Sequence, residues 1–166
     1  MFGLLKKHKQ KLSVVAPISG VFTELERVSD PVFAQKLMGD GFAIKPQPNE
    51  SIVYSPVKAK VVSLSESKHA VGLVTDDGDE VLLHIGIDTV NLNGKGFTAL
   101  VKLGDKVNKG QELIELNRQF LTAKQADLTT IVVLTKLIPE HQNWHFVKTF
   151  GTQVTSQEDI ITQSID

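Results

Sequence analysis

Residues 69–88 read His69-Ala-Val-Gly-Leu-Val-Thr-Asp-Asp-Gly-Asp-Glu-Val-Leu-Leu-His84-Ile-Gly-Ile-Asp88, and this stretch decides the fold. Two apolar runs, residues 70–75 and 80–85, flank an Asp-Asp-Gly-Asp sequence. An Asp-Gly pair between two such runs is a strong signal for a tight turn between antiparallel strands. The stretch therefore predicts a β-hairpin.

This hairpin would bring two histidines together. His69 lies eight residues before Asp77 and His84 six residues after Gly78, so both stand at nearly the same level of the ladder. A single histidine at the end of an apolar strand is more often a structural residue. Two converging imidazoles, beside a Gly86 that allows close approach to the backbone, favour a site that moves a charged group or holds a metal.

Short strands separated by Gly and Pro turns continue along most of the chain. The sequence Ala-Pro-Ile-Ser-Gly of residues 16–20 recurs 39 residues later as Ser-Pro-Val-Lys-Ala in residues 55–59, which is weak evidence for a duplication. Residues 118–128, after the helix-capping Asn117, have helical composition, and residues 129–135 are a β-branched run. The pattern predicts an all-β antiparallel sandwich or barrel with an internally duplicated motif and one or two short helices.

Composition limits the class of protein. The chain has 166 residues, of which 41% are apolar and 22% charged, with a net charge of −1. These values predict a soluble domain without bulk attraction to nucleic acid or anionic membranes. The absence of cysteine excludes disulfides and thiolate metal sites and fits a cytoplasmic location. No apolar run approaches the roughly 20 residues that a membrane span needs.

The chain divides into a leader and one domain. Residues 1–12 place a short apolar part before four lysines, the reverse of a secretory signal, and predict a flexible basic leader that contacts a membrane surface at most weakly through residues 1–11. Residues 13–166 are expected to form a single domain. The initial methionine and the length favour a free-standing protein over a domain of a fused transporter.

Several polar residues near the histidines are candidates for the site. Ser67 would share a face of an extended strand with His69 and could hydrogen-bond its imidazole, although a surface serine is an equal alternative. Asp88 could adjust the electrostatics of the site or simply belong to a turn. His141 and His145 have the i, i+4 spacing of a helical metal pair but lack an acidic third ligand. No phosphate-cradling glycine loop or nucleophile elbow is present.

The histidine stretch resembles a known family. Lys68-His-Ala70, followed by Val-Leu-Leu-His-Ile-Gly-Ile-Asp-Thr-Val in residues 81–90, resembles the signature of the glucose-type enzyme IIA component of the phosphoenolpyruvate-dependent sugar phosphotransferase system. The likeness extends from about residue 14 to residue 154. Further blocks that resemble the family are Ala-Pro-Ile-Ser-Gly at residues 16–20, Phe33-Ala34, Gly-Asp-Gly-Phe-Ala-Ile-Lys-Pro at residues 39–46 and Gly-Asp-Lys-Val-Asn-Lys-Gly at residues 104–110.

The resemblance implies a phosphotransferase that works through a phosphohistidine in bacterial sugar uptake. His84 would accept the phosphoryl group from the phosphocarrier protein HPr and pass it to an enzyme IIB domain, while His69 would stabilise the group. Ser67 falls where the family usually has threonine, which implies a hydrogen bond to the histidine pair. Imidazole suits this chemistry because it is nucleophilic when neutral and leaves readily when protonated.

The resemblance also implies an apolar surface that docks both partners. Val32, Phe33, Met38 and Leu82 fall at or near its positions, whereas Ser65 stands where some members have phenylalanine. The unphosphorylated protein could additionally regulate other proteins by binding them. No cofactor is required, although zinc could bind at His69 and His84.

Two other classes compete with this interpretation. Residues 104–110 resemble the hairpin of lipoyl or biotinyl carriers, but the Met-Lys-Met tip of such carriers is absent. A zinc peptidase of related architecture could use His84 and Asp88 as ligands, but the chain contains no His-x-His pair.

Overall fold

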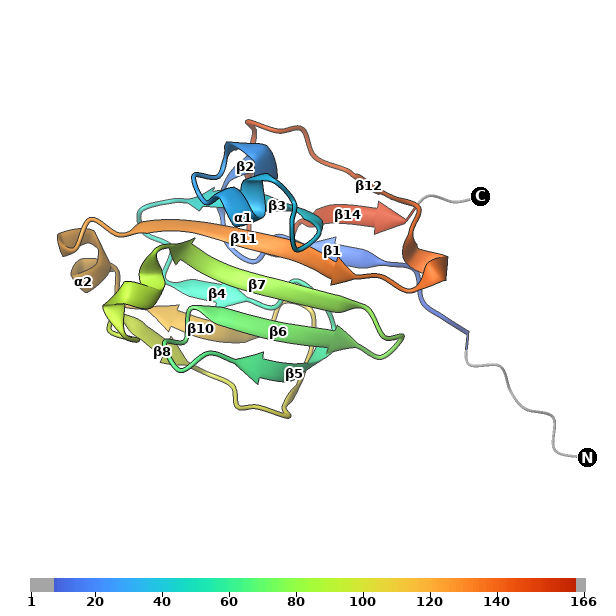
Figure 1. The fold of residues 1–166 in the computed structure, drawn as a ribbon, viewed down its shortest axis with the longest axis horizontal. Helices are drawn as coiled ribbons and strands as arrows, with labels where there is room; N and C mark the ends of the chain where they lie inside the picture. Colours follow the sequence, from blue (N-terminus) through green and yellow to red (C-terminus); the bar gives the residue numbers. More distant parts are fainter. Residues whose placement is uncertain (1–7, 164–166) are drawn as a thin grey trace, which may run out of the picture.

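The computed structural model describes residues 8–163, and Figure 1 shows an almost entirely β architecture. The described strands are β1 (Ser13–Val15), β2 (Gly20–Glu24), β3 (Asp40–Pro46), β4 (Ile52–Tyr54), β5 (Ala59–Leu64), β6 (Ala70–Thr75), β7 (Glu80–Ile87), β8 (Phe97–Ala99), β9 (Lys106–Val107), β10 (Glu112–Leu116), β11 (Asp127–Lys136), β12 (Trp144–Phe146), β13 (Gln153–Val154) and β14 (Asp159–Gln163). The described helical segments are α1 (Pro31–Ala34), α2 (Arg118–Ala123) and the 3₁₀ turns η1 (Leu25–Arg27), η2 (Thr89–Leu92) and η3 (Pro139–His141).

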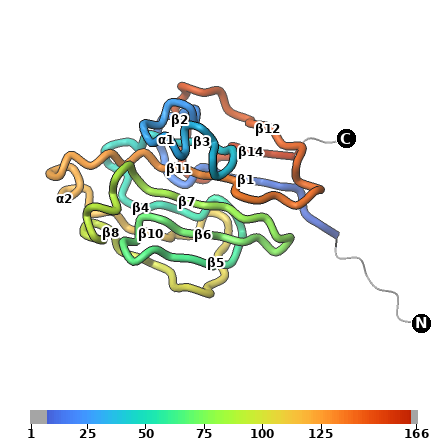
Figure 2. Tube along the Cα trace, in the orientation of Figure 1, coloured from blue at the N-terminus to red at the C-terminus, as the bar shows by residue number. Residues whose placement is uncertain are grey.

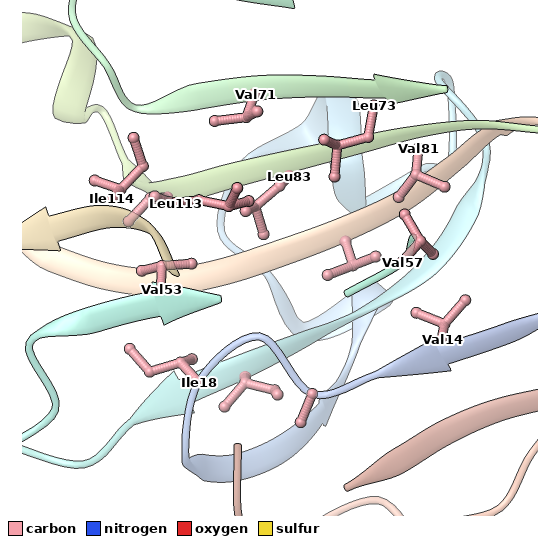
Figure 3. Packing of buried hydrophobic residues seen from close by; sticks show 14 of the residues in the cluster. Val14, Ile18, Val53, Val57, Val71, Leu73, Val81, Leu83, Leu113 and Ile114 are labelled. Carbon is pink, nitrogen blue, oxygen red and sulfur yellow. The ribbon is translucent and has the colours of Figure 1, made fainter. Parts of the chain in front are cut away.

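The strands form three antiparallel sheets. The eight-stranded sheet has the order β13-β2-β3-β11-β7-β6-β5-β9, and the two small sheets have the orders β1-β14-β12 and β4-β10-β8. The small sheets lie against one face of the large sheet (Figures 1 and 2). In Figure 3, Leu83 of β7 faces Val53 of β4 across the shared core. The expected antiparallel sandwich with two short α-helices is confirmed.

The predicted hairpin forms from β6 and β7. Its turn closes with hydrogen bonds from Thr75 N to Asp79 O at 2.9 Å and from Gly78 N to Thr75 O at 3.0 Å. Ala70 pairs with His84 in the ladder, which places His69 and His84 at adjacent levels as the spacing predicted.

The duplicated motif is visible in the backbone. Its two copies lie side by side, joined by hydrogen bonds from Val15 N to Pro56 O at 2.9 Å and from Tyr54 N to Pro17 O at 2.8 Å. The strands β2 and β5 that follow them begin 39 residues apart, and β8, β9 and β10 recur 47 residues later as β12, β13 and β14. The sequence motif that revealed the repeat, centred on Pro17 and Pro56, does not extend to this second part, because these strands have no proline at corresponding positions.

Two local predictions were wrong. The helix expected over residues 118–128 ends at Ala123, because the β-branched run that follows pairs with both β3 and β7 and begins its strand at Asp127. Ser67 lies in the turn between β5 and β6 and not on an extended strand.

Of the predicted leader, residues 1–7 lie outside the described residues, whereas Leu12 is buried in the core. The flexibility of this leader stays a prediction.

A second apolar cluster lies on the opposite face of the large sheet. Its buried members come from η1 and the residue after it, α1, β3 and β11, with side chains of β7 packed against them, and are Leu25, Val28, Phe33, Ala43, Ile131 and Val133. Figure 1 shows α1 lying over this face. No helix within residues 8–163 is long and apolar enough to cross a membrane. The outer cluster supports the histidine pair described next.

Candidate functional site

Strand alternation places His84 on the outer face of the large sheet. Val81, Leu83 and Ile85 of β7 are buried in the inner core, whereas Leu82 and His84 point the other way and are only half-buried. His69 directly precedes β6, and its carbonyl accepts a 2.7 Å hydrogen bond from Ile85 N. The two imidazole ring centroids are 5.0 Å apart with the ring planes at 85°. The structure therefore brings together the two histidines that the hairpin predicted.

Helix α1 supplies an apolar wall beside the pair. The ring centroid of Phe33 is 4.8 Å from that of His84, and Phe33 itself is buried. Asp30 caps α1 by accepting a 2.9 Å hydrogen bond from Val32 N, and Pro31 follows at the first helical position. The Asp-Pro sequence thus fixes the short helix that presses Phe33 against His84.

The site keeps its imidazoles neutral. Burial lowers the pKa of His84 to about 4, and the charge of a protonated His69 would act in the same direction. Asp30 and the backbone of Gly86 oppose this lowering. Burial also lowers the pKa of His69. Asp30, which the sequence analysis did not single out, is therefore the carboxylate that acts on His84.

The two ring nitrogens of His84 differ in access. Nδ1 is buried and has no hydrogen-bond partner among the described residues. Gly86 itself has φ +85°, and a Cβ there would stand 2.3 Å from Thr89 Cγ2 and 2.7 Å from Asp127 O. The glycine is required because nothing larger fits between η2 and β11.

Ser65, and not Ser67, makes the described hydrogen bond to the pair. Ser65 Oγ lies 3.3 Å from His69 Nδ1. Ser67 stands in the adjoining turn, with its backbone near Gly94, and its own hydrogen bond to the histidines stays a prediction. Asp88 is exposed and adopts a left-handed backbone with φ 58° at the start of η2. Its electrostatic role likewise stays a prediction.

The predicted docking residues differ in how exposed they are. Val32 and Met38 are each 42% exposed, Leu82 is half-buried and Phe33 is buried. Leu37, which the sequence analysis did not select, is 68% exposed between Val32 and Met38 in sequence order. An exposed apolar patch beside a reactive group is typical of a transient docking surface.

His141 and His145 do not form the helical metal pair that their spacing would allow. His141 is buried and pairs through Nδ1 with Asp79 Oδ2 at 2.5 Å, while its Nε2 lies 2.7 Å from Gln10 O. It belongs to η3 and His145 to β12, so the two do not share a helix. Within residues 8–163 no three side chains of metal-binding type gather into one site.

One protein family and three known proteins are similar to this chain. Residues 12–138 match the family described as the phosphoenolpyruvate-dependent sugar phosphotransferase system, EIIA 1. A glucose-specific EIIA component of Halalkalibacterium halodurans is 44% identical over 143 residues, which is 82% of each chain. A glucose-specific EIIA component of Staphylococcus aureus is 41% identical over 135 residues, covering 81% of this chain and 80% of the relative. The solved structure of glucose permease IIA from Mycoplasma capricolum superposes with a TM-score of 0.82 at 32% identity, covering 97% of this chain and 99% of that one.

Proposed function

The chain belongs to the EIIA 1 family of the phosphoenolpyruvate-dependent sugar phosphotransferase system, and from this premise we propose that His84 is its phosphoryl carrier. The protein is a phosphotransferase component of the relay that drives sugar uptake, and it works through a phosphohistidine intermediate. The single observation that supports His84 is its placement: a neutral imidazole beside a second imidazole, on an apolar outer face.

The access of the ring nitrogens selects the reacting atom. Because Nδ1 of His84 is buried, Nε2 is the nitrogen that would attack phosphorus. Its bond to phosphorus forms as the bond between phosphorus and the donor atom of HPr breaks, and the ring retains its proton on Nδ1. The reverse exchange then gives the group to the enzyme IIB domain. A low pKa favours this chemistry because the ring is neutral at neutral pH, with one N–H and one nucleophilic lone pair.

His69 would stabilise the transferred group. A phosphoryl group carries roughly −1.5 to −2 charges. An imidazole N–H directed at its oxygens is a preorganised donor in a partly desolvated site, where such donors act most strongly. Asp88 and Ser67 would contribute electrostatics and a further hydrogen bond at the rim. The apolar wall of Phe33 limits the access of water, which would otherwise hydrolyse the phosphohistidine.

The partners follow from the relay. HPr would be the donor and an enzyme IIB domain the acceptor. Both would dock on Leu82, which packs against the cluster of Phe33, and on the exposed apolar side chains at and after α1, which are Val32, Leu37 and Met38. A cytoplasmic location is part of this proposal, because the protein must meet phosphorylated HPr. The names of the relatives suggest glucose as the sugar of the system. Regulatory binding in the unphosphorylated state stays a prediction.

Zinc at the histidine pair would be an additional ligand and not a requirement of the relay. Two imidazoles provide two of the four ligands of a tetrahedral zinc ion, and the described residues offer no third beside them. A partner's carboxylate or water would have to complete the site.

The intact mass of the protein tests the proposal. After incubation with phosphoenolpyruvate, enzyme I and HPr, the wild-type protein should gain one acid-labile phosphoryl group. His84→Ala should gain none, and His145→Gln, which changes a histidine of β12, should behave as wild type. Phosphorylation of the His84→Ala variant, or its absence from the wild type with active carriers, would exclude His84 as the carrier.

A further inference from the structure

Ser65 closes the turn that carries His69. Its backbone N donates to Ala70 O at 3.1 Å, and its carbonyl accepts from Lys68 N at 2.9 Å. Its hydroxyl oxygen accepts a third hydrogen bond, from Ala70 N at 3.2 Å. Lys68, immediately before His69, has a left-handed backbone with φ 56°, a conformation that a side chain of this kind adopts only when its surroundings enforce it. The hydrogen bonds of Ser65 hold the turn, and with it Lys68, in this conformation.

The hydroxyl proton of Ser65 has one described acceptor. Because Oγ already accepts from Ala70 N, the hydroxyl hydrogen remains to be donated, and His69 Nδ1 is 3.3 Å away. We propose that Ser65 is a positioning residue that donates to His69 Nδ1 and so holds the proton of His69 on Nε2. This inference rests on the proposed function, in which Nε2–H of His69 is directed at the phosphoryl group carried by His84.

A neutral imidazole needs such a partner. Burial lowers the pKa of His69, so the ring carries a single proton at neutral pH and can place it on either nitrogen. With the proton on Nδ1, Nε2 would present a lone pair to the phosphoryl oxygens and repel them. With a donor at Nδ1, the ring instead presents its N–H, and the hydrogen bond also fixes the ring orientation.

The assignment differs from the one that the sequence favours. Ser67 occupies the position of the threonine in the resembling family, yet it lies in the turn. Ser65 stands where some members have phenylalanine, an apolar side chain that could not direct a proton. The inferred role is therefore a property of this chain and not of the shared signature.

Nitrogen-15 NMR of the histidine rings tests the inference directly. In the unphosphorylated wild-type protein at neutral pH, His69 should show a protonated Nε2 and an unprotonated Nδ1. This measurement needs no partner protein, so it stands apart from the test of His84 as carrier. A protonated Nδ1 in the wild type would overturn the inference.

Two substitutions and a control add the functional readout. Ser65→Ala should populate both tautomers of His69 and slow transfer from phosphorylated protein to an enzyme IIB domain by about five- to tenfold, the factor expected from one hydrogen bond. Ser65→Thr keeps the hydroxyl and should restore both the tautomer and the rate. Ser63→Ala, an exposed serine on β5, should change neither. If Ser65→Ala retains the wild-type tautomer and rate, Ser65 does not position His69. If Ser65→Ala loses the tautomer and a folded Ser65→Thr does not restore it, the hydroxyl group is not what sets the tautomer of His69.

Discussion

The rings of His69 and His84 meet edge to face, with centroids 5.0 Å apart and planes at 85°. This arrangement leaves one imidazole free to react while the other contributes a hydrogen-bond donor. It also means that the two rings cannot be exchanged in function, because only His84 stands against the wall formed by Phe33.

His69→Gln separates the two functions. The variant should still accept a phosphoryl group on His84, because the nucleophile is intact. Transfer to an enzyme IIB domain should fall by roughly 10²- to 10³-fold, the effect of removing one preorganised donor from a transition state. Rapid-quench measurement of transfer from the phosphorylated variant checks this expectation. Transfer at the wild-type rate would contradict the role given to His69.

The burial of His84 predicts a pH-dependent stability. Its folded-state pKa is about 4, whereas its ordinary value is about 6.5. Between these values the unfolded chain binds the proton more tightly, so the folded state loses stability as the pH falls through this window. The contribution of this residue should amount to about 2 kcal/mol between about pH 7.5 and about pH 5.

Urea unfolding of wild type and His84→Gln at both pH values isolates this contribution. The free energy of unfolding of the wild type should fall more steeply with acidification than that of the variant, since glutamine does not titrate. Parallel pH profiles for the two proteins would show that His84 is not held neutral by burial.

Asp79 lies in the turn of the β6–β7 hairpin, away from the histidine pair, and its contact with His141 should matter for stability. Substitution of either residue should lower the free energy of unfolding. Asp79 is 1% exposed, and besides His141 it accepts from Ile138 N at 3.0 Å and Thr75 Oγ1 at 3.3 Å. His141→Ala leaves this buried carboxylate without its imidazole hydrogen-bond partner, which should cost about 3 kcal/mol of unfolding free energy. Chemical denaturation measures the loss.

A double-mutant cycle and a solvent-accessible control pair complete this test. Asp79→Asn combined with His141→Ala should be less destabilised than the sum of the single variants, because the uncompensated charge is gone. Lys148→Gln, which breaks the half-exposed pair with Glu158, should change stability little. Strict additivity of the Asp79 and His141 variants would show that the two groups are not coupled.

Features that are determined by residues close together in the sequence could be predicted, and features that depend on distant residues could not. The Asp-Gly turn and strand alternation bring His69 and His84 together, because both are decided within twenty consecutive residues. The contact of Ser65 with His69 could not be predicted in this way, because it depends on a tight turn with a left-handed Lys68 that strand periodicity does not indicate.

Contacts between distant segments were invisible for a different reason. Asp79 and His141 lie 62 positions apart, and nothing in either neighbourhood indicates the other. The action of Asp30 on His84 similarly needs α1 to fold over β7. The 47-residue repeat was also missed, because its signal is short: Gly-Asp-Lys-Val at residues 104–107 and Gly-Thr-Gln-Val at residues 151–154 share only their glycine and valine, although both stretches end in a paired strand.

Gly86→Ala tests whether the backbone behind His84 tolerates any side chain. The added Cβ would meet Thr89 Cγ2 at 2.3 Å and the carbonyl oxygen of Asp127 at 2.7 Å, and this oxygen cannot move aside unless β11 moves.

The matched control is Gly104→Ala. Gly104 has a φ of +91°, similar to the +85° of Gly86, but a Cβ there would have no heavy atom within 4 Å. Both variants pay about 1–3 kcal/mol for the left-handed backbone. Only Gly86→Ala should lose further unfolding free energy and accept phosphoryl groups more slowly, because η2 and β11 are pushed apart next to the nucleophile. Equal unfolding free energies for the two variants in urea titrations, with equal rates of phosphorylation, would show that this close packing does not hold His84 in place.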